Sequence, residues 1–326
     1  MPRLTKPAFI ERSEHRLELR ETMSEAKTTR SKVIPRIVGG LGNQLFVYAA
    51  ARRLAIAGNA ELVIDDVSGF IRDYAYQRRY QLDRFHISSR KASPAERLEP
   101  FSRLRRYVSR RYNQRLPFEE RTYIQQDGLD FDPRLLRIRP RRTLYLEGYW
   151  QSEGYFKDVE RVIRSDLRIR PPTDGINDAM AAKIRKGESV AVHVRFFDEP
   201  EVRTNGLNNA PLDYYARAIA TMETLTDAAH YFVFSDRPSA ARARLPLPDE
   251  RITLVAHNQG DENAYADLWL MTQCRHFIIA NSTFSWWGAW LAGHQGKRVI
   301  APGFGKLDGG MQWGFEGLLP EDWIKV

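Results

Sequence analysis

The 326-residue sequence lacks several features that would place a protein in a membrane or outside the cell. It contains a single cysteine, Cys274, which excludes an internal disulfide and any need for an oxidising compartment. No segment approaches the roughly 18 uninterrupted apolar residues of a membrane-spanning helix. Residues 1–32 carry no apolar run of the kind found in secretory signals. Together these absences predict a cytoplasmic protein.

Several common catalytic signatures are also missing. The sequence has neither a phosphate-binding loop that ends in Gly-Lys-Ser/Thr nor a Gly-x-Ser-x-Gly elbow, and its histidines lack metal-ligand spacing. The one Asp-x-Asp motif, Asp130 to Asp132, lies in a loop-like stretch before Pro133. We therefore expect that the protein uses neither a metal ion nor a cofactor.

Positive charge is what the sequence has in excess. Lysine and arginine total 50 against 41 acidic residues, which gives a net charge of +9. Much of this charge lies in two arginine-rich segments, 103–115 and 137–142. Such segments indicate either a solvated helix and loop or a patch that holds the protein near a membrane or an anionic acceptor. No recognisable nucleic-acid module accompanies them, so we do not expect nucleic acid as a partner.

The sequence divides into three parts. Residues 1–32 are polar and charged, and are predicted to be a disordered or loosely attached leader. Residues 33–186 begin with a strand, a glycine-rich turn, a helix over 43–57 and a second strand. Residues 187–326 contain apolar strand-like runs separated by helical stretches, such as 213–225 and 262–273. These runs lie at 189–195, 231–235, 252–256, 277–281 and 298–301.

Strands that alternate with helices favour a parallel sheet covered on both faces. We therefore predict an α/β fold in which two Rossmann-type domains, 33–186 and 187–326, face a cleft. Ligands of such sheets bind beyond the carboxyl ends of the strands.

Two strand ends in the second domain carry polar side chains. His193 and Arg195 point to the same face of their strand, and Arg195 can bind a phosphate through two of its guanidinium nitrogens. Alternatively, Arg195 closes a turn by pairing with Asp198. Ser235 and Asp236 end another strand, where Asp236 would either accept hydrogen bonds from guanine or cap the next helix.

Two predicted helix starts can bind a diphosphate through free backbone N–H groups. The first carries polar side chains at Asn281, Ser282, Thr283 and Ser285. The second follows the glycine-rich turn that contains Gly40 and Gly42, and it includes Asn43. Glycines here permit close approach of a ligand, but they are equally typical of a tight strand-to-helix turn.

Seven segments, taken in order, resemble glycosyltransferase family 11, the α-1,2-fucosyltransferases of bacteria and animals. They are GGLGNQLFVYAAARRLA from Gly39, YQLDRF from Tyr80, YLEGYWQSEGYF from Tyr145, HVRFFD from His193, LDYYARAI from Leu212, FVFSD from Phe232 and IIANSTFSWWGAWLA from Ile278. The resemblance extends over residues 37–326.

The resemblance implies a GT-B-type enzyme that transfers L-fucose from GDP-fucose to a glycan hydroxyl, with inversion and without metal. The N-terminal domain would face the acceptor, a terminal galactose or a lipid-linked glycan. The C-terminal domain would hold GDP, with Arg195 on the β-phosphate, His193 near the nucleotide and the hydroxyls of the helix start at 282–285 facing the phosphates. Asn43 would face the reaction centre. Asp198 is our choice for the general base, with Glu199 and Glu201 as alternatives.

This sequence departs from the family pattern at three positions. Phe196 and Phe197 stand where the family usually has Arg and Gly, and Arg237 replaces a second Asp. A basic group near the acceptor or the diphosphate is therefore missing. If the second Asp reads guanine in relatives, base recognition here shifts to Asp236 or elsewhere. Two alternatives stay open: a transferase that uses GDP-mannose or GDP-rhamnose, and a non-catalytic nucleotide-sugar-binding protein.

Overall fold

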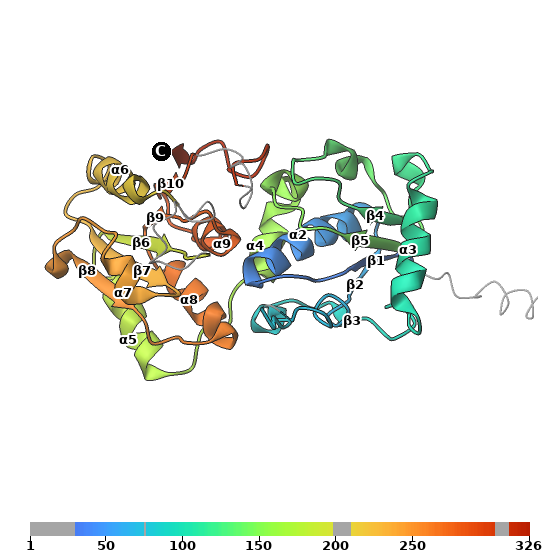
Figure 1. Cartoon of the computed structure of the whole chain (residues 1–326), viewed down its shortest axis with the longest axis horizontal. Coiled ribbons are helices and arrows are strands. Elements are labelled where there is room, and N and C mark those ends of the chain that lie inside the picture. The colour runs from blue at the N-terminus through green and yellow to red at the C-terminus, as the bar shows by residue number, and fades with distance from the viewer. Residues whose placement is uncertain (1–29, 75, 198–209, 304–312) are drawn as a thin grey trace, which may run out of the picture.

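The computed structural model describes residues 30–74, 76–197, 210–303 and 313–326, and it consists of two halves side by side (Figure 1). Each half contains a parallel β-sheet with helices packed against it. The α/β class predicted from the sequence is therefore confirmed. Most of the predicted leader lies outside the described residues, and the first strand begins at Lys32.

The first half contains a five-stranded sheet in the order β3-β2-β1-β5-β4. Its strands are β1 (Lys32–Pro35), β2 (Glu61–Ile64), β3 (Arg90–Lys91), β4 (Tyr123–Gln125) and β5 (Leu144–Glu147). Its helices are α2 (Leu41–Ala57), α3 (Ser102–Asn113) and α4 (Glu160–Asp166). Only β1, α2 and β2 are evident from the sequence. Strands β3 and β4 have only two and three residues, and β5 lies in a stretch rich in arginine and aromatic residues.

The second half contains a six-stranded sheet in the order β11-β10-β9-β6-β7-β8. Its strands are β6 (Ser189–Val194), β7 (His230–Ser235), β8 (Ile252–Val255), β9 (His276–Ile278), β10 (Val299–Ala301) and β11 (Ile324–Lys325). Its helices are α6 (Leu212–Glu223), α7 (Pro238–Arg242), α8 (Ala264–Met271) and α9 (Thr283–Leu291). All five strands predicted here are present, and β11 is an addition.

Short 3-10 helices connect these elements. They are η1 (Leu82–Arg84), η2 (Phe118–Glu120), η3 (Pro133–Arg137), η4 (Glu153–Tyr155), η5 (Lys157–Val159), η6 (Asp249–Arg251) and η7 (Asp261–Asn263). Helix α5 (Gly175–Ile184) precedes the second sheet in sequence and packs against α8. The domain boundary at residues 186/187 stays a prediction.

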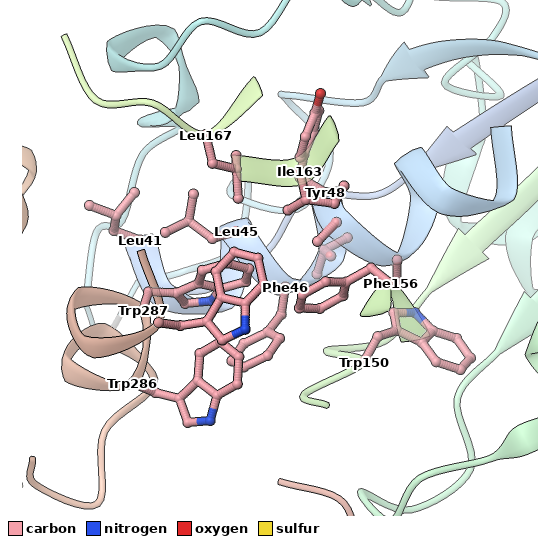
Figure 2. Packing of buried hydrophobic residues seen from close by; sticks show 14 of the residues in the cluster. Leu41, Leu45, Phe46, Tyr48, Trp150, Phe156, Ile163, Leu167, Trp286 and Trp287 are labelled. Atoms are coloured by element: carbon pink, nitrogen blue, oxygen red, sulfur yellow. The ribbon is translucent and has the colours of Figure 1, made fainter. Parts of the chain in front are cut away.

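The two halves share one continuous hydrophobic core, in which α2 packs against α9. Figure 2 shows Phe46 of α2 beside Trp286 and Trp287 of α9. The ring of Phe46 lies 4.5 Å from that of Trp286 and 4.9 Å from that of Trp287, while Phe156 stacks on Trp287 at 5.6 Å. These large rings are almost completely buried, and burial of such residues contributes strongly to stability. The aromatic core therefore holds the start of α2 against the start of α9.

Within the described ranges, no helix is both long enough and apolar enough to cross a bilayer.

Candidate active site

The two predicted helix starts meet directly. Glycine at position 42 makes this possible, because a Cβ atom there would overlap the backbone of Thr283 and would lie only 2.6 Å from the amide nitrogen of Phe284. The side-chain oxygen of Asn43 accepts hydrogen bonds from the hydroxyl of Thr283 at 3.0 Å and from the amide of Gln151 at 2.7 Å. The structure thus brings the glycine-rich turn and the polar α9 start together across more than two hundred residues.

The hydroxyls at the α9 start differ in what they contact. Ser282 is the N-cap residue, and its side chain accepts a hydrogen bond from the N–H of Phe284 at 3.4 Å. Ser285 is fully buried and donates to the carbonyl of Ser282 at 3.2 Å. Asn281 is also buried, between the end of β9 and the helix. Ser282 and Thr283 are the more accessible members of this group.

Sequence reasoning missed Arg78, which lies at the start of α2. Gly40 is the N-cap residue of α2, and a Cβ atom there would overlap the guanidinium of Arg78. Gly40 therefore makes room for a cation next to the free N–H groups of the helix. Arg78 forms no ion pair with any residue that the structure describes. Nothing in the sequence distinguishes it from Arg72, Arg79 or Arg84 nearby.

Arg195 and Asp236 join the ends of β6 and β7. The two strands are parallel neighbours, with Val194 opposite Ser235. Arg195 therefore reaches the carboxylate of Asp236, at 3.3 Å. The other carboxylate oxygen accepts the N–H of Phe196 at 3.2 Å.

The hypothesis that Asp236 caps the following helix is wrong, because Arg237 is the N-cap residue of α7. Ser235 instead accepts the N–H of Arg237 at 3.0 Å. About a third of the Arg195 side chain is exposed, which leaves its guanidinium accessible to an anion.

His193 lies behind Arg195 in a buried position. Only 5% of its surface is exposed, and its ring centre lies 5.5 Å from that of Phe284. Burial, with a smaller contribution from the charge of Arg195, lowers the pKa of His193 to about 3. Its Nδ1 atom is buried and has no hydrogen-bond partner among the described residues. The imidazole is therefore neutral near pH 7, so it can exchange one hydrogen bond with a ligand but supplies no charge.

The remaining predicted residues include the candidate bases. Asp198, Glu199 and Glu201 lie outside the described residues. In the described part of the chain, no group of three or more His, Cys, Asp or Glu side chains is placed to hold a metal ion.

The Asp-x-Asp residues have structural contacts. Asp130 accepts the N–H of Glu316 at 3.1 Å, and Asp132 caps η3 and binds Arg134.

The chain is similar in sequence to known glycosyltransferases. The model of glycosyl transferase family 11 matches residues 97–306, which include the ends of β6 and β7 and the start of α9. An α-1,2-colitosyltransferase from Escherichia coli is 28% identical over 287 residues, covering 83% of this chain and 91% of the relative. The O-antigen biosynthesis glycosyltransferase WbnK from the same species is 28% identical over 290 residues, covering 81% and 91%. Galactoside α-(1,2)-fucosyltransferase 1 of Plecturocebus brunneus is 26% identical over 162 residues, covering 46% and 43%.

Solved structures show the same fold. The NodZ α-1,6-fucosyltransferase soaked with GDP-fucose aligns with a TM-score of 0.51 at 16% identity, covering 81% of this chain and 93% of that one. A second structure of fucosyltransferase NodZ, from Bradyrhizobium, aligns with a TM-score of 0.50 at 15% identity, covering 81% and 94%. The predicted GT-B-like architecture is thereby confirmed.

Proposed function

This chain belongs to glycosyl transferase family 11, and we propose that it transfers L-fucose from GDP-fucose to a glycan hydroxyl. The observation that carries the proposal is the sheet order around Arg195. Partly exposed Arg195 follows β6, and β6 pairs with β9, which leads into the α9 start that contacts Asn43. Family membership makes the protein a glycosyltransferase, while the donor and acceptor are the proposal.

The mechanism follows from the charges at this site. As the sugar leaves, negative charge grows on the β-phosphate and must be stabilised by groups already in place. Arg195 can supply a full positive charge, whereas neutral His193 can supply only a hydrogen bond. The N–H groups at the start of α9 add the positive end of a helix dipole. With these groups, the reaction needs no metal ion in our proposal.

We further infer inversion at the anomeric carbon in a single displacement. The acceptor hydroxyl attacks that carbon, the bond to the diphosphate oxygen breaks, and GDP departs with the bonding electrons. Asp198 would take the hydroxyl proton as general base. Asn43, held by Gln151 and Thr283, lies where an acceptor in the first half would meet the donor. Its amide nitrogen is available to orient a sugar hydroxyl.

The contacts of Asp236 favour a second role for this residue, which is to orient Arg195. Both of its carboxylate oxygens already accept hydrogen bonds or an ion pair, from Phe196 and Arg195. We propose that Asp236 orients Arg195 toward the phosphate, and that any contact with guanine uses the remaining lone pairs.

Two observations favour a donor sugar other than fucose. Phe196 and Phe197 replace the usual Arg and Gly, and a relative that covers most of the chain is an α-1,2-colitosyltransferase. Nucleotide-activated colitose, GDP-mannose and GDP-rhamnose are therefore alternative donors. The name of the O-antigen relative favours a lipid-linked glycan as acceptor, and the fucosyltransferase relative favours a terminal galactose.

The decisive experiment measures thermal stabilisation by GDP, GDP-fucose, GDP-mannose, UDP and ADP, with EDTA present throughout. A ligand that binds only the folded state adds about 2.7 kcal/mol at one hundred times its Kd. We expect shifts with GDP and GDP-fucose, followed by fucose transfer to galactose-ending oligosaccharides. Stabilisation by GDP-mannose alone would select the second donor. Stabilisation by GDP without transfer to any acceptor would support a non-catalytic binding protein. No shift with any guanine nucleotide would contradict the site.

A further inference from the structure

Helix α3 packs against the first half through its polar side. Arg106 is buried and forms an ion pair with buried Asp65 at 3.1 Å. Asn113, also buried, accepts the N–H groups of Thr122 and Tyr123 at 2.7 and 3.0 Å. These contacts fix which side of the helix faces the protein, and that side is not the apolar one.

The opposite side of α3 presents apolar and aromatic side chains to solvent. Each has more than half of its surface exposed, and the values reach 78% for the residue that precedes the helix. These residues are Phe101, Leu104, Tyr107, Val108 and Tyr112. Residues four apart lie on the same face of a helix, so Leu104, Val108 and Tyr112 form one continuous stripe. A contiguous exposed apolar surface of this kind marks an interaction site.

Arginines flank this apolar stripe. The side chains concerned are all exposed, and they are Arg103, Arg105, Arg111 and Arg115. At 100° per residue, Arg105 falls on one side of the stripe and Arg103 and Arg111 fall on the other. None of the four forms an ion pair within the described residues, and the sequence from 100 to 118 contains no acidic residue. The charge is therefore free to attract an anionic surface.

We propose that α3 docks the protein on an anionic lipid membrane, with its apolar stripe inserted at the interface. A helix with aromatic and aliphatic side chains between arginines suits that environment, because tyrosine rings favour the headgroup level and guanidinium groups bind anionic headgroups. Figure 1 shows α3 at the end of the molecule remote from the second half. In this proposal, the arginine-rich segment 103–115 binds anionic lipid headgroups.

Docking through α3 would place the first half against the membrane, on the side where we expect lipid-linked acceptors. The second half would lie on the side away from the bilayer, toward soluble nucleotide sugars (Figure 1). The docking surface itself does not depend on which sugar is transferred.

Co-sedimentation with phosphatidylcholine vesicles, with and without phosphatidylglycerol, tests this inference. Wild-type protein should bind only the anionic vesicles. The double change Leu104→Ser and Val108→Ser should weaken binding about tenfold or more, because two apolar side chains no longer enter the interface. Arg103→Ser and Arg111→Ser should each weaken it about fivefold, since one arginine near an anionic surface contributes about 1 kcal/mol.

Two matched changes on other exposed surfaces serve as controls. Ile176→Ser removes an apolar side chain that is 63% exposed on α5, and Arg170→Ser removes an exposed charge outside α3. Both should bind vesicles as the wild type does. Thermal unfolding of each variant without ligand, followed by circular dichroism, reports whether it remains folded.

Three outcomes would overturn the docking surface. Wild-type protein would fail to bind anionic vesicles, or the Leu104→Ser and Val108→Ser variant would bind them as tightly as the wild type. In the third, light scattering without lipid would show a wild-type dimer that this variant converts to a monomer. That result would assign the stripe to a second copy of the chain.

Discussion

The two helices that meet at the candidate site reach it by different means. Helix α2 can lie close to its neighbours because its first residues include glycines. Gly40 leaves room for Arg78, and Gly42 leaves room for the backbone of Thr283. Helix α9 approaches through short hydroxyl side chains that cap its own first turn. The first half thus contributes close fit and one amide, Asn43. The cation that we assign to phosphate comes from the second half.

The site therefore depends on two separable properties. Close packing of the two halves requires that residue 42 has no side chain. Negative charge in the transition state is balanced, in our proposal, by Arg195 at the end of β6. Changes on the first side should therefore act on stability, and changes on the second side on turnover.

The largest expected effect comes from removing the charge of the second half. Arg195→Ala should lower kcat/KM by about a thousandfold, equivalent to about 4 kcal/mol, because the leaving diphosphate loses its cation. The free energy of unfolding should change by less than about 1 kcal/mol, because the pair with Asp236 is partly exposed.

Steady-state kinetics with the donor found by thermal shift, together with urea unfolding, measure both quantities. Arg217→Ala, on the exposed face of α6, removes an arginine from another surface ion pair and should leave both unchanged. Near-full activity of Arg195→Ala would refute the phosphate role.

The next largest effect comes from filling the space at the first side. Gly42→Val should destabilise the protein by about 3 kcal/mol, because the added atoms overlap the backbone of Thr283 and must push α2 from α9. Gly187→Val is the matched control, since no atom lies within 4 Å of a Cβ there. Chemical unfolding compares the two variants. Equal stability of both would mean that the helix starts do not meet as closely as described.

Part of this comparison could be predicted from the sequence. The runs that end at Arg195 and Asp236, and the polar start of α9, follow regular patterns of apolar residues. The sequence does not show that Arg195 pairs with Asp236, since that contact depends on which strands are neighbours in the sheet. It also does not show that Gly42 faces Thr283, because a glycine carries no pattern that identifies a distant partner.

Helix α3 illustrates the same limit from its charge pattern. Its composition predicts an arginine-rich helix, and its periodicity separates a polar from an apolar side. From the sequence alone, the apolar side of the helix would be predicted to face the protein core. The buried pair between Arg106 and Asp65 reverses that choice, and the partner lies forty-one residues earlier in the chain.

Buried His193 gives a pH dependence that belongs to the second half alone. Its pKa is about 3 in the folded protein and 6.5 when exposed, so below pH 6.5 the unfolded chain binds a proton that the folded chain does not. Stability from this group is complete above pH 6.5 and falls by about 2 kcal/mol at pH 5.

Asp267 has the opposite slope, because burial raises its pKa to about 7 and favours the folded state at lower pH. The difference between wild type and His193→Asn, measured by urea unfolding at pH 5 and pH 7, isolates the histidine. We expect the variant to lose about 2 kcal/mol less than the wild type between these two pH values. An equal loss in both proteins would show that His193 is not buried in its neutral form.

The smallest expected effect concerns the hydrogen bond from Thr283 to Asn43, which joins the two helix starts. Thr283→Val keeps the shape of the side chain and removes its donor, and Asn43→Ala removes the acceptor. A double-mutant cycle should give a coupling free energy of about 1 kcal/mol, typical of one partly buried hydrogen bond. Gln151→Ala should couple to Asn43→Ala more strongly than to Thr283→Val, since the amide of Gln151 donates to the asparagine. If the coupling between Asn43 and Thr283 is zero while Gly42→Val is strongly destabilising, packing alone joins the helices and Asn43 is free to serve the acceptor.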